Sequence, residues 1–212
     1  MGYFMGNIKV VIYDCDGVIV NSDNAILKYY SWLAKVSGVE MPDFSDETFK
    51  RIVLSYTEDG IIEVISGGDI NIKNQIYHTI HNEPYNSGFE DIILEPTIKD
   101  GLEIVKKHGI PMAVDTNRGR SLSDLLTYFN IRQYFTCLIT SRDVVNPKPA
   151  PDGVYEICKF YNVEPANILF IGDSMTDYGA AKSSGANFLA YKNTLEDAPI
   201  IYDHKDIEKY LF

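Results

Sequence analysis

The chain has 212 residues, of which 45% are hydrophobic and 23% are charged, and its formal net charge is −11. This length suffices for one sizeable core with a small insertion, and no run approaches the roughly 18 apolar residues of a membrane span. Such an acidic balance argues against nonspecific nucleic-acid binding, which needs clustered Lys and Arg. Cys15, Cys137 and Cys158 lie far apart without a CxxC pair, which favours unpaired thiols and predicts a cytoplasmic protein.

The N-terminal segment predicts a buried strand followed by a helix. Residues 8–13 form a short β-branched and aromatic run that precedes the turn residue Gly17, a pattern typical of a buried strand. Residues 21–37 carry apolar side chains at helical spacing, with Ser22 as N-cap and Gly38 as the stop.

The segment from Ser45 to Tyr85 contains no run in which apolar and polar residues alternate as they do in a strand. Its apolar residues recur at helical spacing, and glycines and prolines separate the runs. We therefore expect an all-helical insertion after the first strand, with helices from Ser45 or Asp46 to Leu54, over residues 58–65 and over residues 72–81.

After Glu95-Pro96 the pattern changes to alternating helices and strands. Such alternation is typical of βαβ units and predicts a doubly wound parallel sheet of the α/β class. The tail, residues 203–212, is expected to form a final helix. The expected helices are 98–108, 121–130, 151–161 and 176–184, and the expected strands are 111–115, 137–140, 167–171 and 187–191.

Two carboxylates stand at the exit of the first strand, Asp14 and Asp16, and Gly17 follows them. Carboxylates this close repel each other unless a cation lies between them or one carries a proton. Gly17 allows the backbone to approach a ligand without a Cβ in the way. This pattern indicates a paired-carboxylate site at the carboxyl edge of the sheet, although the same residues also occur in plain acidic turns.

Polar residues also follow the later strands, and the carboxyl ends of parallel strands lie on one edge of a sheet. Hard divalent cations take oxygen ligands, and a phosphoryl group needs cationic and N–H donors around its oxygens. Together with Asp14 and Asp16, these residues indicate metal-assisted phosphoryl chemistry. The later stretches are Asp115-Thr116-Asn117, Pro147-Lys148-Pro149 and Gly172-Asp173-Ser174-Met175-Thr176-Asp177.

In order and spacing these stretches resemble the four motifs of the haloacid dehalogenase superfamily, in its aspartate-nucleophile phosphatase branch. The resemblance covers most of the chain, and four motifs in order are a specific signal. The matching residues are Asp14-Cys15-Asp16-Gly17-Val18-Ile19, Thr116-Asn117, Lys148-Pro149-Ala150-Pro151-Asp152 and Gly172-Asp173-Ser174-Met175-Thr176-Asp177.

The resemblance implies a Rossmann-like α/β core, residues 1–22 and 94–212, with a helical cap over residues 23–93 inserted after the first motif. The linkers near Ser22 and Leu94 would act as hinges. The implied activity is Mg²⁺-dependent hydrolysis of a small phosphomonoester through an aspartyl-phosphate intermediate. The expected partner is a small phosphorylated metabolite, with no nucleic-acid or membrane partner and a monomer as the expected state.

The resemblance also implies roles for single residues. Asp14 would attack phosphorus, and Asp16 would protonate the leaving oxygen and later accept a proton from water. Gly17, the Thr116 hydroxyl and the Asn117 amide would hold the phosphate. Lys148 would neutralise charge on the nucleophile and the phosphate.

The resemblance further implies a Mg²⁺ site. Its ligands would be the Asp14 carboxylate, the Asp16 backbone carbonyl and the Asp173 carboxylate, with Asp177 just outside, through water or Lys148. Purely structural roles stay open for two of these residues. Asp177 could be only an acid in the first turn of a helix, and Thr116 could be only a helix N-cap.

Substrate choice is expected to come from arginines that suit a second anionic group by bidentate pairing. The candidates are Arg51 with Lys50 in the cap and Arg118 with Arg120 in the core, and solvated surface charges explain each of them equally well.

Two other functions stay open. A phosphomutase resembling β-phosphoglucomutase is suggested by Asp16-Gly17-Val18-Ile19, although Ile26 stands four residues after Ser22, where that mutase family carries His. A non-catalytic protein that keeps the site as a ligand pocket is the third hypothesis.

Overall fold

The computed structural model describes residues 7–40, 43, 45, 50, 54–82 and 89–212. The chain divides into two compact units, Met1–Asn21 with Leu94–Phe212 and Ser22–Ile93. The role of the second unit as a cap stays a prediction. Most of the helix predicted from Ser45 or Asp46 to Leu54 lies outside the described residues.

The larger unit is built on a six-stranded sheet in the order β5-β4-β1-β6-β7-β8. Every neighbouring pair in this sheet is parallel, which confirms the predicted α/β class. From the central β1 the chain adds β4 and β5 on one side and β6, β7 and β8 on the other, so the sheet is doubly wound. The strands are β1 (Val10–Tyr13), β4 (Met112–Thr116), β5 (Phe135–Thr140), β6 (Ile168–Gly172), β7 (Asn187–Tyr191) and β8 (Ile200–Ile201).

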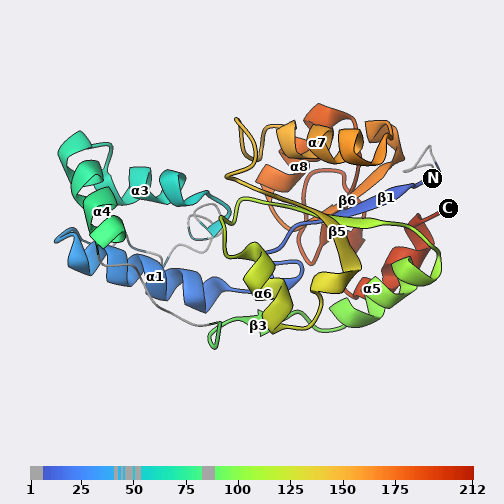
Figure 1. The fold of residues 1–212 in the computed structure, drawn as a ribbon, viewed down its shortest axis with the longest axis horizontal. Helices are drawn as coiled ribbons and strands as arrows, with labels where there is room; N and C mark the ends of the chain where they lie inside the picture. The colour runs from blue at the N-terminus through green and yellow to red at the C-terminus, as the bar shows by residue number, and fades with distance from the viewer. Residues whose placement is uncertain (1–6, 41–42, 44, 46–49, 51–53, 83–88) are drawn as a thin grey trace. The chain divides into compact units, whose positions relative to one another are not determined.

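Helices cover both faces of this sheet (Figure 1). Helices α7 (Asp152–Tyr161) and α8 (Met175–Ser184) lie on one face, where they contact β4 to β7. Helix α5 (Ile98–Lys107) lies on the other face with a C-terminal 3-10 helix, η3 (His204–Tyr210), and α6 (Leu122–Tyr128) lies on the α5 side.

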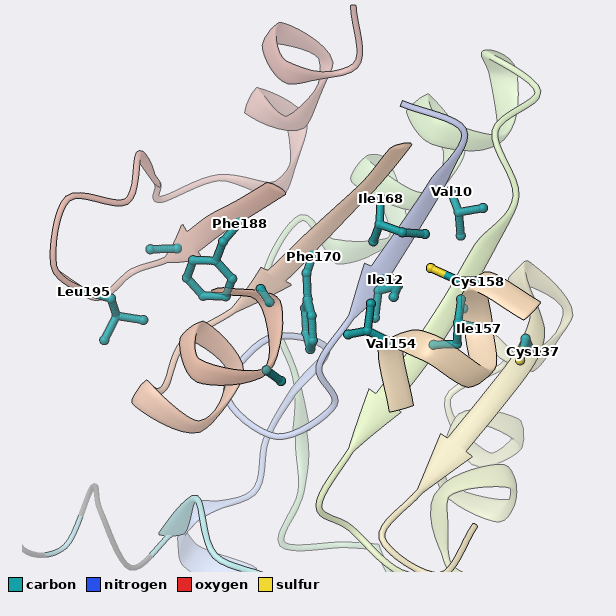
Figure 2. Packing of buried hydrophobic residues seen from close by; sticks show 14 residues of the cluster. Val10, Ile12, Cys137, Val154, Ile157, Cys158, Ile168, Phe170, Phe188 and Leu195 are labelled. Carbon is teal, nitrogen blue, oxygen red and sulfur yellow. The ribbon is translucent and has the colours of Figure 1, made fainter. Parts of the chain in front are cut away.

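The core under α7 and α8 combines β-branched and aromatic side chains with alanine, cysteine and leucine (Figure 2). Val154 and Ile157 of α7 point toward Ile12 of β1, and Phe170 of β6 faces Phe188 of β7. Each fully buried side chain of this kind contributes roughly 1.5–3 kcal/mol relative to exposure. This packing holds the strand ends in a fixed order, and with them the polar residues that follow each strand.

The smaller unit contains α1 (Asp23–Val36), α3 (Glu58–Ser66) and α4 (Ile70–Asn82). Their apolar faces meet in one cluster of Tyr30, Leu33, Ile61, Ile62, Ile65 and Ile76. Helix α4 begins before residue 72, where the sequence predicted its start, because the Asp69 carboxylate accepts hydrogen bonds from Asn71 N and Ile72 N. Within the described residues, no helix combines the length and the apolar character needed to cross a membrane.

Three features differ from the sequence analysis. The two-residue strands β2 (Val20–Asn21) and β3 (Ile93–Leu94), which pair with each other, and the edge strand β8 were not predicted, because two residues carry no periodicity. The tail forms a 3-10 helix where an α-helix was expected over 203–212. Hydrogen bonds such as Asp206 N to Asp203 O join residues three apart and give it the tighter winding.

His204 of this tail is buried in the larger unit, with 1% of its surface exposed. Its Nε2 donates to Val18 O at 3.0 Å, and its ring stacks on Tyr191 with centroids 4.2 Å apart. Its Nδ1 is buried with no partner among the described residues. Burial lowers the pKa of His204 to about 4, because a second N–H there would have no acceptor.

We therefore expect a pH dependence of stability that traces to His204. Its pKa is lower in the folded state (about 4) than its ordinary value of 6.5. The unfolded chain thus gains the proton first, and stability that is fully present above about pH 6.5 is lost as the pH falls towards 4, by up to about 3 kcal/mol. Urea unfolding at pH 7, 5.5 and 4 measures this loss. In His204→Gln the fall should be smaller by that amount, and parallel curves for the two proteins would contradict the assignment.

Candidate active site

The predicted site residues of the larger unit gather at the carboxyl edge of its sheet. Asp14 and Asp16 follow β1, Thr116 is the last residue of β4, and Asp173 follows β6. Because β1 lies between β4 and β6, these strand ends are adjacent. The chain reverses its winding direction here, which is where open α/β sheets bind ligands.

Lys148 lies at the centre of the group, with its side chain only 3% exposed. Its Nζ donates to Asp14 Oδ1 at 2.8 Å, to Asp177 Oδ1 at 2.5 Å and to Asp115 O at 2.9 Å. All three N–H donors of the ammonium are therefore engaged. The neighbouring carboxylates hold the pKa of Lys148 above its ordinary value although burial opposes this, so the side chain stays charged.

Asp177 is fully buried and held from two sides. Its Oδ1 binds Lys148, and its Oδ2 accepts from Ser174 N, Ser174 Oγ and Asp173 N. Ser174 and Asp177 form a capping box at the start of α8. Asp177 is thus an acid in the first turn of α8, and it also contacts Lys148 directly.

Three carboxylates of this edge, Asp14, Asp173 and Asp177, each present an oxygen within 4.8 Å of the others. Burial and the charge of Asp177 raise the pKa of Asp14 to about 7, and burial, Asp177 and Asp14 raise that of Asp173 well above its ordinary value. Burial is the largest cause of each shift, and the neighbouring carboxylates add negative charge. A group of carboxylate oxygens at this spacing, two of them buried and one partly exposed, fits a hard divalent cation.

Gly17 brings the loop after β1 against this group. Its φ of 88° lies in the left-handed region, and a Cβ placed on it would come within 2.2 Å of Asp173 Oδ2. A side chain at position 17 would therefore displace the Asp173 carboxylate. The glycine is needed for this close approach, and its predicted contact with phosphate stays a prediction.

Thr116 and Asn117 shape the turn after β4. Thr116 Oγ1 accepts from Arg118 N at 3.1 Å, and Asn117 Nδ2 donates to Lys148 O at 3.1 Å. The helix that follows has Ser121 as its N-cap, so Thr116 does not cap it. Asn117 thus holds the backbone of Lys148 and Thr116 that of its own turn, and their roles toward phosphate stay predictions.

Asp16 lies beside the group, and its carboxylate pairs with Arg118. Arg118 Nε donates to Asp16 Oδ2 at 3.0 Å and Nη2 to Oδ1 at 2.5 Å. The sequence analysis predicted Arg118 as a residue that binds substrate and did not anticipate this pair, whose members are 102 positions apart.

The sequence analysis assigned no role to three residues that support the group. Ser174 is the N-cap of α8 and donates to Asp177 Oδ2, Asn193 Nδ2 donates to Asp173 O at 2.7 Å, and the backbone carbonyl of Asp115 accepts from Lys148 Nζ. The serine was detectable, because Ser-x-x-Asp before a helix is close to the capping-box pattern. The other two depend on contacts between distant segments and leave no local signal.

Two predicted residues lie in the smaller unit. Arg51 lies outside the described residues, and the role predicted for Lys50 beside it stays a prediction.

In the larger unit, Asp115, which precedes Thr116, has its carboxyl group buried against Gly153 of α7. Burial raises the pKa of Asp115 to about 6.

A family model described as haloacid dehalogenase-like hydrolase matches residues 11–191. A phosphoglycolate phosphatase of Haemophilus influenzae is 27% identical over 191 residues, which are 84% of this chain and 82% of that protein. A phosphorylated carbohydrates phosphatase of Thermotoga maritima is 24% identical over 180 residues, covering 84% and 82%. A solved haloacid dehalogenase-superfamily hydrolase of subfamily IA from Geobacter sulfurreducens is 28% identical, with a TM-score of 0.75 and 99% of both chains covered.

Proposed function

Because the chain belongs to the haloacid dehalogenase-like hydrolase family and is similar to phosphoglycolate phosphatases, we propose that it is a Mg²⁺-dependent phosphatase of small phosphomonoesters. Asp14 is the nucleophile, and the reaction passes through an aspartyl-phosphate on its carboxylate.

The observation that carries this proposal is the position of Lys148. One buried ammonium contacts Asp14 and Asp177 while Asp173 lies beside them. A nucleophilic carboxylate needs a cation that keeps it ionised and tolerates the approach of a phosphate dianion. Lys148 supplies that charge from a fixed direction, because Asp177 and Asp115 O hold its Nζ from the other sides.

In the first half of the reaction a carboxylate oxygen of Asp14 forms a bond to phosphorus. The ester P–O bond breaks, and Asp16 gives its proton to the leaving oxygen. Lys148 balances the charge that builds up around phosphorus. The phosphoryl group then sits on Asp14, and the alcohol leaves.

In the second half water attacks the phosphoryl group, and Asp16 takes a proton from it. The bond between Asp14 and phosphorus breaks, which releases inorganic phosphate and restores the Asp14 carboxylate. The same carboxyl group serves first as acid and then as base.

The residues that would hold Mg²⁺ are the Asp14 and Asp173 carboxylates and the Asp16 backbone carbonyl, with Asp177 adjacent. Their fit rests on the three carboxylate oxygens within 4.8 Å of one another and on the raised pKa values of Asp14 and Asp173. When bound, the cation supplies positive charge that lets a dianionic ester approach this acidic edge.

The test is release of inorganic phosphate from a panel of small esters, in Mg²⁺ and in excess EDTA. The names of the relatives suggest phosphoglycolate and phosphorylated carbohydrates as the first members. We expect release from one or a few esters that stops in EDTA and returns when Mg²⁺ is restored. Equal release with and without the chelator would contradict the metal requirement.

A second assay separates the phosphatase from a phosphomutase. A hexose 1-phosphate is incubated with catalytic hexose 1,6-bisphosphate, and the products are resolved by ³¹P NMR. The proposal predicts free phosphate as the product. Conversion to hexose 6-phosphate without phosphate release would favour the mutase.

A further inference from the structure

The pair of Asp16 and Arg118 is bidentate and well shielded from solvent. Nε and Nη2 of the guanidinium each donate to a different oxygen of the carboxylate. The remaining arm, Nη1, donates to Ser121 Oγ at 3.3 Å. The side chains of Arg118 and Asp16 are 13% and 20% exposed. A planar fork of this kind fixes both the position and the plane of the carboxylate.

The two partners come from neighbouring strands of the sheet. Asp16 follows β1, and Arg118 follows β4, whose turn is fixed by the bond from Arg118 N to Thr116 Oγ1. Ser121 stands at the N-cap of α6. The direction of the Asp16 carboxyl group is therefore set by β4 and α6 as well as by its own loop.

Direct binding of substrate by Arg118 would be costly in this arrangement. The guanidinium would have to leave Asp16 and Ser121, and a largely buried carboxylate would lose this bidentate partner. The fork in contrast keeps the two side chains paired. A carboxylate has about four lone-pair directions, and the fork uses one on each oxygen.

We propose that Arg118 is a positioning residue that acts through Asp16. It holds the Asp16 carboxyl group where that group meets the leaving oxygen and then the attacking water, and it does not contact the substrate. This inference rests on the proposed function, and it replaces the role that the sequence predicted for Arg118.

The test compares two esters with different need for a proton. The leaving alkoxide of an alkyl phosphate requires protonation, whereas the p-nitrophenolate of p-nitrophenyl phosphate leaves without it. The comparison uses the rate at which the alcohol or phenolate is released in a single turnover, because the later hydrolysis of the aspartyl-phosphate needs Asp16 with either ester. In Arg118→Met we expect this release rate for the alkyl ester to fall about 10- to 100-fold, since general acid catalysis is worth about 10²–10⁴. For p-nitrophenyl phosphate the release rate should fall less than about threefold, and the half-saturating concentration of both esters should stay within about twofold.

Arg132→Met is the matched control, because it removes another half-buried guanidinium. Arg132 donates to Phe135 O at the start of β5, the end of the strand away from the carboxyl edge of the sheet. In this variant the ratio of the two release rates should equal that of the wild type. Equal losses of the release rate on both esters in Arg118→Met would indicate a merely structural role. A raised half-saturating concentration with an unchanged release rate would indicate substrate binding, and either result would overturn the inference.

A double-mutant cycle gives the second test. If Arg118 acts through Asp16, Arg118→Met should change the alkyl-ester rate of Asp16→Asn by less than about twofold. Independent, multiplying losses would overturn the inference.

Ser121→Ala provides a milder variant, should Arg118→Met fail to fold, because it removes only the Nη1 bond. Its rate on the alkyl ester should fall more than its rate on p-nitrophenyl phosphate, by a smaller factor than in Arg118→Met. A ratio of the two rates equal to that of the wild type would count against the inference. Hydrolysis of both esters by the wild type reports on the proposed function, whereas their ratio in the variants reports on Arg118.

Discussion

Asp14→Asn should abolish phosphate release, with kcat lowered about 10³-fold or more. The amide cannot form the phosphoryl bond, although it fills the same space. The fold should survive, because Lys148 keeps Asp177 Oδ1 and Asp115 O as acceptors. The change also removes a carboxyl group whose pKa burial and Asp177 raise to about 7, so above that pH the variant avoids the cost of a buried charge.

The measurement is phosphate release under single-turnover conditions, beside the thermal midpoint of the same sample. Asp152→Asn is the matched control, because Asp152 lies at the start of α7 and accepts from Asn146 rather than from Lys148. It should retain wild-type turnover. Substantial turnover in Asp14→Asn would rule out this residue as the nucleophile.

Lys148→Met should both inactivate and destabilise the protein. Removal of one partner from a buried charge group typically costs about 3–5 kcal/mol, because the opposite charges remain without compensation. Here Asp14 and Asp177 would remain, the latter with no surface exposed. Guanidinium unfolding without divalent cations should therefore show a loss of this size.

Two comparisons identify charge as the cause. The double variant Lys148→Met/Asp14→Asn should recover part of the lost stability, because it carries one buried negative charge fewer. Mg²⁺ at matched ionic strength should raise the thermal midpoint of Lys148→Met more than that of the wild type. Lys182→Met removes an exposed lysine beside Tyr178 and should change little. A double variant no more stable than Lys148→Met would contradict the argument.

The order of helices and strands in the larger unit was predictable because its signals are local. A β-branched run such as residues 10–13 predicts a strand through its own side chains. Gly185 ends α8 with a φ of 84° because the left-handed region favours glycine. The prediction failed where local signals are absent, as in the two residues of β8 and in the 3-10 winding of η3.

The sequence by itself determined which chemical groups stand at the strand ends, because alternating helices and strands place Asp14, Thr116 and Asp173 on one edge of a parallel sheet. Only the tertiary structure decided how these groups pair. Lys148 reaches Asp14 across 134 positions, and Arg118 reaches Asp16 across 102. Such pairs depend on the order of strands and on the rotamers that close packing selects, and neither property is written in the spacing of residues along the chain.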